Sequence, residues 1–379
     1  MSINGEDIDN KKLGIHVFGG GRGESIVIEM PTGGWGVVDC YASCASNPDM
    51  NPTLRFLKDR GVRRLEFLCL THPHDDHFRG MSHLLNNAIE VGQFWRPAAL
   101  TPQDLKRLVL VRRAKMVGRD EASAGELPSK DEFGRILKYV ADKKIPVRPL
   151  GGIASIYPEK GIPIGATTSK RPFDISVIGP HYDRSNFYVE KLNECFDADG
   201  RFTDPENELP HNEISIGLLI RFGTTRVILG GDLEEKNWQQ ILKCCDPDHL
   251  AVDLVKVSHH GSRTGYTSDL WETFAGKCKP IAIIAPSSTH GLPKKDAVEH
   301  ILSHTPNVYA TSLDAIKYAK LRKIELPPGT TPTDVKELGS RGVRQMVRRN
   351  EESCGRCSVL LDNMGVALLD SPPPAGQLV

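Results

Sequence analysis

Three histidines and two aspartates lie within six residues of this chain, in the run His72-Pro73-His74-Asp75-Asp76-His77. Imidazole nitrogens and carboxylate oxygens are ligands that Zn²⁺ and Mn²⁺ accept. His72 and His74 stand two residues apart and can converge on one cation, while Asp76 and His77 can turn toward a second. A solvated polar loop would explain a single histidine, but four donors at this spacing predict a site for two metal ions.

The residues before this run predict where it lies in the fold. Residues 62–70 end in apolar side chains typical of a buried strand, so the run falls on the loop at the carboxyl end of that strand. Active sites of layered α/β proteins collect at this edge. A helix is expected to open at residues 81–85, and His83 on it turns away from the loop after one turn, which indicates packing rather than metal binding.

Five further blocks of sequence frame the metal-binding run. They are Gly14–Ile28, Trp35–Asp39, Asn212–Ile220, Thr224–Asp232 and Leu254–Ser262. In this order, they resemble the metallo-β-lactamase superfamily and, within it, the ComEC-like metallo-hydrolases. The resemblance reaches from about residue 13 to about residue 312. It implies an α/β fold, a four-layer αβ/βα sandwich in which two mixed sheets lie face to face with helices outside.

The resemblance also implies a set of metal ligands. His72, His74 and His211 are expected to bind the first ion, Asp76, His77 and His260 the second, and Asp232 both. His211 stands four residues before Ser215, as the family's histidine does before a small residue, but it is alternatively a neighbour of the site beside a structural Asn212. His74 departs from the ComEC-like pattern, which often has aspartate there, and favours full occupancy by two ions.

Other residues of the matching blocks are expected to act on the substrate. His290 resembles a later histidine of the family and is either a general acid or a loop histidine that caps the next helix. His259 is either a substrate contact or an outer partner that orients a ligand. The predicted catalytic residues are Asp76, Asp232 and His290, and the predicted substrate-binding residues are Lys256, His259 and Ser262.

The chemistry expected of two such ions is hydrolysis. Two ions about 3.5–4 Å apart lower the pKa of a bridging water and supply hydroxide at neutral pH. The ComEC-like resemblance favours a phosphodiesterase, most of all a nuclease acting on DNA. The alternatives are an enzyme for a small phosphodiester or another ester, and a metal-containing module that binds nucleic acid or a partner protein. Either Zn²⁺ or Mn²⁺ suits the donors.

The length of 379 residues and the spread of the motifs favour one hydrolase domain over residues 1–312. Within it, residues 100–145 predict a helical insertion in which helices begin at Thr101-Pro102 and Asp131. Residues 180–210 predict a long loop without periodicity, the candidate lid. Residues 313–379 are expected to be an extension packed on the same domain; basic stretches at 315–323 and 341–349 suggest a nucleic-acid-facing edge or a solvated face.

Composition sets further limits on the function. The formal net charge is zero, which does not favour a strongly basic nucleic-acid-binding protein. The polar N-terminus has no apolar signal segment and no apolar stretch is long enough to span a membrane, so a cytoplasmic protein without membrane contact is expected. Nine scattered cysteines, an odd number, are typical of reduced thiols, and Cys354 and Cys357 alone lack the second pair that a structural zinc needs.

Overall fold

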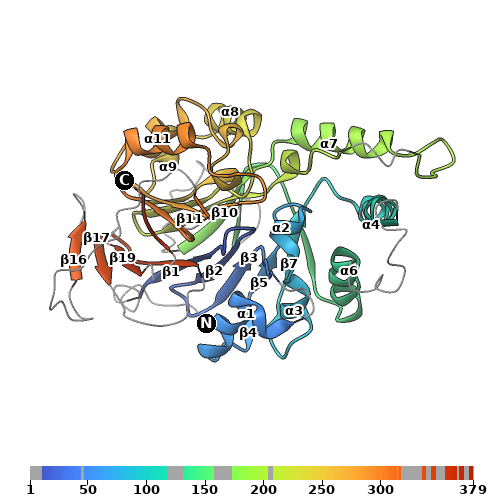
Figure 1. The fold of residues 1–379 in the computed structure, drawn as a ribbon, viewed down its shortest axis with the longest axis horizontal. Coiled ribbons are helices and arrows are strands. Elements are labelled where there is room, and N and C mark those ends of the chain that lie inside the picture. The colour runs from blue at the N-terminus through green and yellow to red at the C-terminus, as the bar shows by residue number, and fades with distance from the viewer. Residues whose placement is uncertain are drawn as a thin grey trace.

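Two β-sheets packed face to face form the centre of the computed structural model (Figure 1). The structure describes the residues 11–43, 47–117, 131–157, 173–203, 208–313, 315–316, 335–338, 343–346, 355–364, 367–370 and 375–378.

The first sheet combines strands from both ends of the chain. In the described residues it has ten strands, in the order β16-β17-β19-β18-β1-β2-β3-β5-β7-β8. The C-terminal β18 pairs antiparallel with β1, so the two ends of the chain meet in one sheet. The strands are β1 Leu13–Phe18, β2 Ser25–Glu29, β3 Trp35–Val38, β5 Phe67–Cys69, β7 Phe94–Pro97, β8 Val147–Leu150, β16 Val335–Leu338, β17 Val343–Met346, β18 Arg356–Leu361 and β19 Ala367–Asp370.

The second sheet is built mainly from the middle of the chain. Its eight described strands run in the order β20-β15-β14-β13-β12-β11-β10-β9, and those from β12 to β15 are parallel. They are β9 Ala154–Tyr157, β10 Phe173–Gly179, β11 Gly217–Phe222, β12 Thr225–Leu229, β13 Leu254–Lys256, β14 Ile281–Ile284, β15 Val308–Ala310 and β20 Gly376–Gln377. A separate pair of short strands consists of β4 Arg64–Leu65 and β6 Glu90–Val91.

Helices cover the outer face of each sheet. Figure 1 shows α8, α9 and α11 over the second sheet, α1 and α3 over the first, and α4, α6 and α7 to one side. The helices are α1 Pro52–Asp59, α2 Asp75–Phe78, α3 Met81–Leu85, α4 Pro102–Val117, α6 Glu132–Asp142, α7 Tyr182–Glu194, α8 Glu235–Cys244, α9 Pro247–Leu250, α10 Leu270–Phe274 and α11 Lys295–His304.

The side-chain period of the strands explains the four layers. Phe67 and Cys69 of β5 point into the core between the sheets, whereas Leu68 points to the helices outside. In β12, Val227 faces the same inner core and Ile228 faces α8 and its neighbours. Since both sheets are apolar on both faces, each sheet must be packed against another layer on both of its faces. The result is the predicted four-layer αβ/βα sandwich, so this fold class is confirmed.

The predicted helices of the insertion are present, and the predicted long loop is wrong. Helix α4 begins at Pro102, and the side chain of Asp131 caps α6 by accepting from the N–H of Gly134. Residues 182–194 form α7 rather than a loop. Its periodicity is weak because in this polar helix only Tyr188 and Leu192 are buried.

Some predictions concern parts of the chain outside the described residues. Most of the basic stretches at 315–323 and 341–349 lies there, as does Cys354, so the nucleic-acid-facing edge stays a prediction. The domain boundary at residue 312 also stays a prediction. Within the extension, β18 and β19 form an antiparallel pair. No helix in the described residues is long and apolar enough to cross a membrane.

Candidate metal centre

The candidate metal ligands lie at the carboxyl ends of strands from both sheets. Asp39 follows β3 and residues 71–77 follow β5, its parallel neighbour. Asp232 follows β12, and His260 follows β13, which pairs with β12 in parallel. Parallel pairing places these ends at one edge, and the packed sheets bring the two edges together.

Asp232 occupies the middle of the cluster. Its Oδ1 lies 3.3 Å from Nε2 of His77, and its Oδ2 lies 3.8 Å from Nε2 of both His72 and His260. Gly231 before it has a φ of 51°, and a Cβ there would come within 2.6 Å of the Ser215 hydroxyl. The glycine therefore permits the tight turn that brings Asp232 between donors of both groups, where a bridging ligand was expected.

The first set of donors, here called the His72 group, consists of His72, His74 and Asp232. Nε2 of His72 lies 2.9 Å from Nδ1 of His74. The His211 ring lies edge-on to His74 with 4.9 Å between centroids, and its Nδ1 lies 3.0 Å from the Tyr188 hydroxyl of α7. His211 is thus beside the group but outside the set of donor atoms within 4.8 Å of one another.

The second set, here called the His77 group, consists of Glu24, His77, Asp232 and His260. Asp76 adjoins it, with Oδ2 3.2 Å from Nε2 of His260 and Oδ1 4.0 Å from Nε2 of His77. The predicted donors of the second ion therefore lie together.

Hydrogen bonds from the Nδ1 atoms fix the ring orientation of the two histidines in the His77 group. Nδ1 of His77 donates to Oδ2 of Asp39 at 2.7 Å, and Nδ1 of His260 donates to the Ala285 carbonyl at 2.8 Å. Asp39 also accepts from the N–H and hydroxyl of Thr71, which anchors the metal-binding loop. Each Nε2 is thereby directed at the cluster, and such outer partners orient metal ligands in known sites.

Glu24 is a buried part of the site that the sequence did not predict. It follows the glycine-rich turn after β1, and its carboxylate forms an ion pair with the fully buried Lys256. Its Oε2 also lies 3.3 Å from Nδ1 of His260, and its Oε1 lies 3.9 Å from Nδ1 of His77. Glu24 thus lies on the Nδ1 side of both rings, opposite the Nε2 atoms that point at the cluster.

This ion pair corrects the prediction for Lys256. The side chain is fully buried, within 3.5 Å of the Gly231 carbonyl, and its ammonium group faces Glu24 rather than a space where substrate could lie. It is therefore a structural counter-charge. All three residues of β13 are buried. A sequence pattern of this kind does not show whether the lysine side chain points to a buried partner or to a substrate.

The other predicted substrate residues lie apart from the donors. His259 contacts Thr264, Glu234 and Asn212 through its ring nitrogens, at 3.1 to 3.3 Å. His259 therefore contacts the polar residues Thr264, Glu234 and Asn212 and does not orient a metal ligand through its ring nitrogens. His290 is exposed in a turn, where its backbone N–H donates to the Ser287 carbonyl. No hydrogen bond or ion pair joins its side chain to the donor groups in the described residues, so its role as a general acid stays a prediction. The Ser262 hydroxyl accepts from the N–H of Thr264, which makes it a local cap.

Burial sets the charge of the His72 group. Desolvation lowers the pKa values of His72 and His211 well below the ordinary histidine value, and it lowers the pKa of His74 as well. All three rings are therefore neutral near pH 7. A neutral imidazole has a lone pair free for a cation.

The His77 group has the opposite balance. Burial by itself would lower the pKa of His77, but Asp232 and Asp39 outweigh it and raise that pKa well above the ordinary value. The pKa of His260 is likewise raised, because Asp232 and Asp76 offset its burial. Burial would raise the pKa of Asp232, yet His77 and His260 hold it well below its usual range.

The donor atoms fit a divalent metal ion. Within the described residues, five buried atoms of the cluster make no hydrogen bond: Nε2 of His77, Nε2 of His260, Oδ1 of Asp232 and the two Glu24 oxygens, of which Oε2 pairs with the Lys256 ammonium. Buried polar atoms are rarely left in this state without a bound water or ion. The set contains nitrogen and oxygen without thiolate, which suits Zn²⁺ or Mn²⁺.

Arg112 of the helical insertion holds the metal-binding loop from outside. Its guanidinium donates to the Pro73 carbonyl at 3.1 Å and pairs with Asp75. It also lies over the rings of Phe78 and Phe133, 4.8 and 5.8 Å from their centroids. Charge, hydrogen bond and ring contacts together fix α4 against the loop.

Comparison with known proteins gives structural likeness only. No protein-family model matches the chain, and no curated protein sequence matches it. The chain is similar to a mutant of the CmlA β-hydroxylase (14% identity, TM-score 0.38), covering 77% of this chain, and it spans only about half of that protein, 49%. It is also similar to Zn²⁺-bound PqqB from Methylobacterium extorquens, with 10% identity over 78% of this chain and 97% of PqqB, at a TM-score of 0.39. A further similar structure is Tm1679, a metal-dependent hydrolase of the β-lactamase superfamily, with 13% identity over 78% and 94% of the two chains and a TM-score of 0.40.

Proposed function

We propose that this protein is a metal-dependent hydrolase of phosphodiesters, with nucleic acid, and DNA above all, as its substrate. The observation that carries the proposal is the pair of donor groups that share Asp232, together with Nε2 of His77 and of His260, which point at the carboxylates of Asp232 and Asp76 and make no hydrogen bond. Two divalent ions held there would lower the pKa of water and neutralise a phosphoryl oxygen.

The residues of the chain divide the work of such a site. Asp232 and Asp76 supply carboxylates to the ions, and Asp39 keeps the His77 ring in the orientation that presents Nε2. The Ala285 carbonyl does the same for His260. Ligands whose outer partners are fixed lose little freedom when a cation binds, which favours a preformed site.

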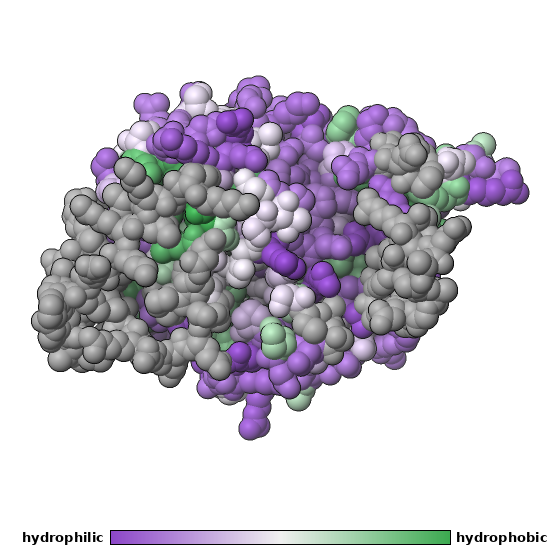
Figure 2. Space-filling model, in the orientation of Figure 1, coloured by the Kyte–Doolittle hydropathy of each residue, from purple (hydrophilic) through white to green (hydrophobic). Residues whose placement is uncertain are grey.

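Positive charge near the centre supports an anionic substrate. Arg112 and Lys115 of α4 are near enough to His211 to lower its pKa, after the larger effect of burial. Burial raises the pKa of Tyr41, and the charges of Arg79 and Arg22 oppose that rise, so both guanidinium groups lie near Tyr41. Figure 2 shows a largely hydrophilic surface between α2 and α7. Arginine and lysine around a di-metal site suit phosphate better than a neutral ester.

A smaller phosphodiester is the second candidate. Tyr188 of α7 contacts His211, so α7 borders the His72 group and narrows approach from that side. A protein that uses the metals only to bind nucleic acid or a partner protein is the third. It would load the same ions and hydrolyse no phosphodiester.

The test is hydrolysis of bis(p-nitrophenyl) phosphate and of labelled single- and double-stranded DNA, with Mn²⁺ or Zn²⁺. Wild type is compared with Asp76→Ala and with Asp199→Ala, whose exposed side chain pairs only with Arg201 in the described ion pairs. We expect metal-dependent cleavage that Asp76→Ala loses and Asp199→Ala retains. Equal rates in wild type and Asp76→Ala would refute the proposal, and cleavage of the small ester without cleavage of DNA would favour the second candidate.

A further inference from the structure

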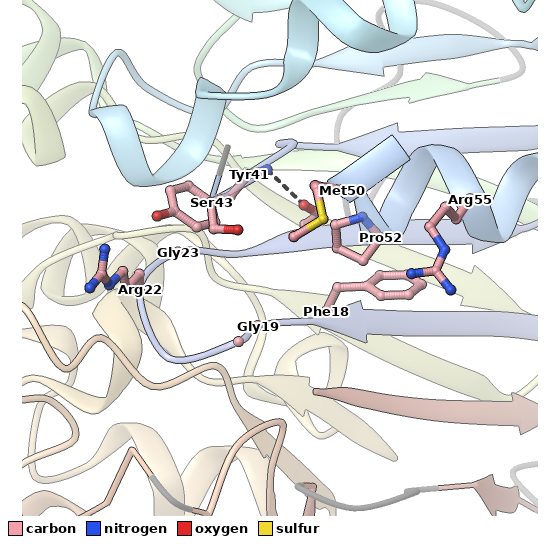
Figure 3. Close-up of a pocket in the computed structure, with 11 residues that line it drawn as sticks. Phe18, Gly19, Arg22, Gly23, Tyr41, Ser43, Met50, Pro52 and Arg55 are labelled. Atoms are coloured by element: carbon pink, nitrogen blue, oxygen red, sulfur yellow. Dashed lines mark hydrogen bonds between the residues drawn. The ribbon is translucent and has the colours of Figure 1, made fainter. Parts of the chain in front are cut away.

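A groove of about 300 Å³ lies beside the metal centre, between the glycine-rich turn after β1 and the start of α1. Figure 3 shows the turn along one side, with Tyr41, Ser43 and Met50 along the other. Arg22 stands at one end of the groove and Arg55 at the other, close to Phe18 (Figure 3). Both arginines are exposed, and Met50 has 54% of its surface exposed.

The groove shares a wall with the metal-binding loop. The Asp76 carbonyl accepts from the N–H of Glu24 at 3.0 Å. A Cβ on Gly23, which lines the groove, would clash with that carbonyl and with the Tyr41 ring. No side chain fits between the two, so only backbone separates the groove from the loop that bears the proposed ligand Asp76.

The lining offers two kinds of contact. Arg22 and Arg55 supply guanidinium groups, which pair with phosphate oxygens in a forked geometry. Tyr41 is half-buried, and its aromatic ring provides a face on which a base stacks, while the exposed Met50 adds an apolar side chain farther along the groove. Tyr41 is held in place because its N–H donates to the Ser25 hydroxyl at 2.8 Å.

We propose that this groove binds one nucleotide of a single-stranded nucleic acid, next to the phosphodiester that lies at the metal centre. The inference rests on the proposed function, to which it adds a binding site for the nucleotide beside the cleaved phosphodiester and a preference for single strands. The volume is at the lower end for small-ligand pockets and suits one nucleoside with its phosphate rather than a duplex. A positively charged groove with a stacking ring is how proteins bind single strands without reading their sequence.

Gly20 gives a way to block the groove without disturbing its frame. It lines the groove, a Cβ there would meet nothing within 4 Å, and its φ lies outside the left-handed region. Gly20→Glu adds bulk and negative charge, Gly20→Gln adds the same bulk without charge, and Gly20→Ala is the matched control. Circular dichroism and thermal melting check that each variant folds.

Binding is measured on metal-free protein, by fluorescence anisotropy with a labelled short single-stranded DNA. We expect wild type and Gly20→Ala to bind within about twofold of each other, and Gly20→Gln and Gly20→Glu to bind about tenfold or more weakly, the loss of one stacked base. Loss with Gly20→Glu but not with Gly20→Gln would show a general charge effect and overturn the proposal. Absence of binding by wild type would also overturn it.

A second readout separates this inference from the proposed function. Hydrolysis of bis(p-nitrophenyl) phosphate by metal-loaded Gly20→Gln is expected within about twofold of wild type, because that ester has no neighbouring nucleotide to place in the groove. An equal loss on DNA and on the small ester would overturn the groove as a separate site. Failure of wild type to hydrolyse any phosphodiester would instead refute the proposed function, whatever the binding data show.

Discussion

The two halves of the metal centre differ in charge although they share Asp232. The His72 group has neutral histidines and no other carboxylate in its set, whereas the His77 group adjoins Asp76 and Asp39, and the charge of its Glu24 is balanced by Lys256. Carboxylates stabilise a divalent cation more than neutral imidazoles do, particularly where water is excluded. The comparison predicts that the His77 group binds its ion more tightly and fills first.

Removing one histidine from each half is the most direct way to break this comparison. His260→Gln should weaken the tighter ion by more than about 100-fold, since loss of an outer partner alone costs about 10–100-fold. His74→Gln should leave that ion bound and lose the weaker one. Metal content after dialysis and calorimetric titration with Zn²⁺ measure both. If His74→Gln lost the tighter ion and His260→Gln kept it, the order of the two halves would be reversed.

The second prediction concerns the buried ion pair behind the His77 group. Glu24→Gln leaves the Lys256 ammonium buried without its counter-charge, which should lower the free energy of unfolding by about 3–5 kcal/mol. Urea unfolding of the metal-free protein measures the loss. Glu24→Gln combined with Lys256→Met removes both charges and should recover most of it. A single variant as stable as wild type would mean that the pair contributes nothing to the fold.

The metal-binding run could be predicted because its donors are contiguous, and a short loop after a strand leaves them little choice of direction. Asp232 was expected because the block Thr224–Asp232 resembles the metallo-β-lactamase superfamily, and the resemblance supplies its role. The ion pair of Glu24 with Lys256 could not be predicted, because it joins distant segments across the interface between the two sheets. Nothing local tells a buried lysine on a strand from a substrate-binding one.

The helical part of the molecule shows the same limit. Helix α6 was predicted because its apolar residues recur at helical spacing and Asp131 caps it. Helix α7 was missed because a helix with two buried side chains leaves almost no apolar stripe, and tertiary contacts such as that of Tyr188 with His211 hold it in place. The local sequence pattern therefore predicted the metal-binding loop better than it predicted helix α7, which borders the His72 group.

The third prediction uses pH to sharpen the comparison. Carboxylates outweigh burial and raise the pKa values of His77 and His260 above the ordinary value, so in the metal-free protein both rings keep their protons to a higher pH than an ordinary histidine does. A cation must displace these protons, and its affinity should rise with pH by up to about tenfold per unit for each proton released. Burial keeps the His72 and His74 rings neutral, so the ion there should respond little.

Titration calorimetry in two buffers of different ionisation enthalpy counts the released protons. The His74→Gln variant should retain the proton release of the tighter ion, and His260→Gln should reduce it. Equal proton release at the two ions would contradict the difference in charge between the halves.

The smallest effect is expected from Arg112, which acts on the metal-binding loop without touching either donor group. Arg112→Gln removes the ion pair with Asp75 and the guanidinium contacts with Phe78, and it weakens the link to the Pro73 carbonyl. Partly exposed pairs contribute about 1 kcal/mol or less, so we expect a loss of up to about fivefold in phosphodiester hydrolysis. The neighbouring Arg113 pairs with Asp131 on the exposed side of α4, and Arg113→Gln is the matched control that should retain full activity.

Because Arg112 holds the segment from Pro73 to Asp75, between the donors of the two halves, its loss should weaken the binding of both ions by a similar factor. Weakening of only one ion would show that the loop is held in two independent parts.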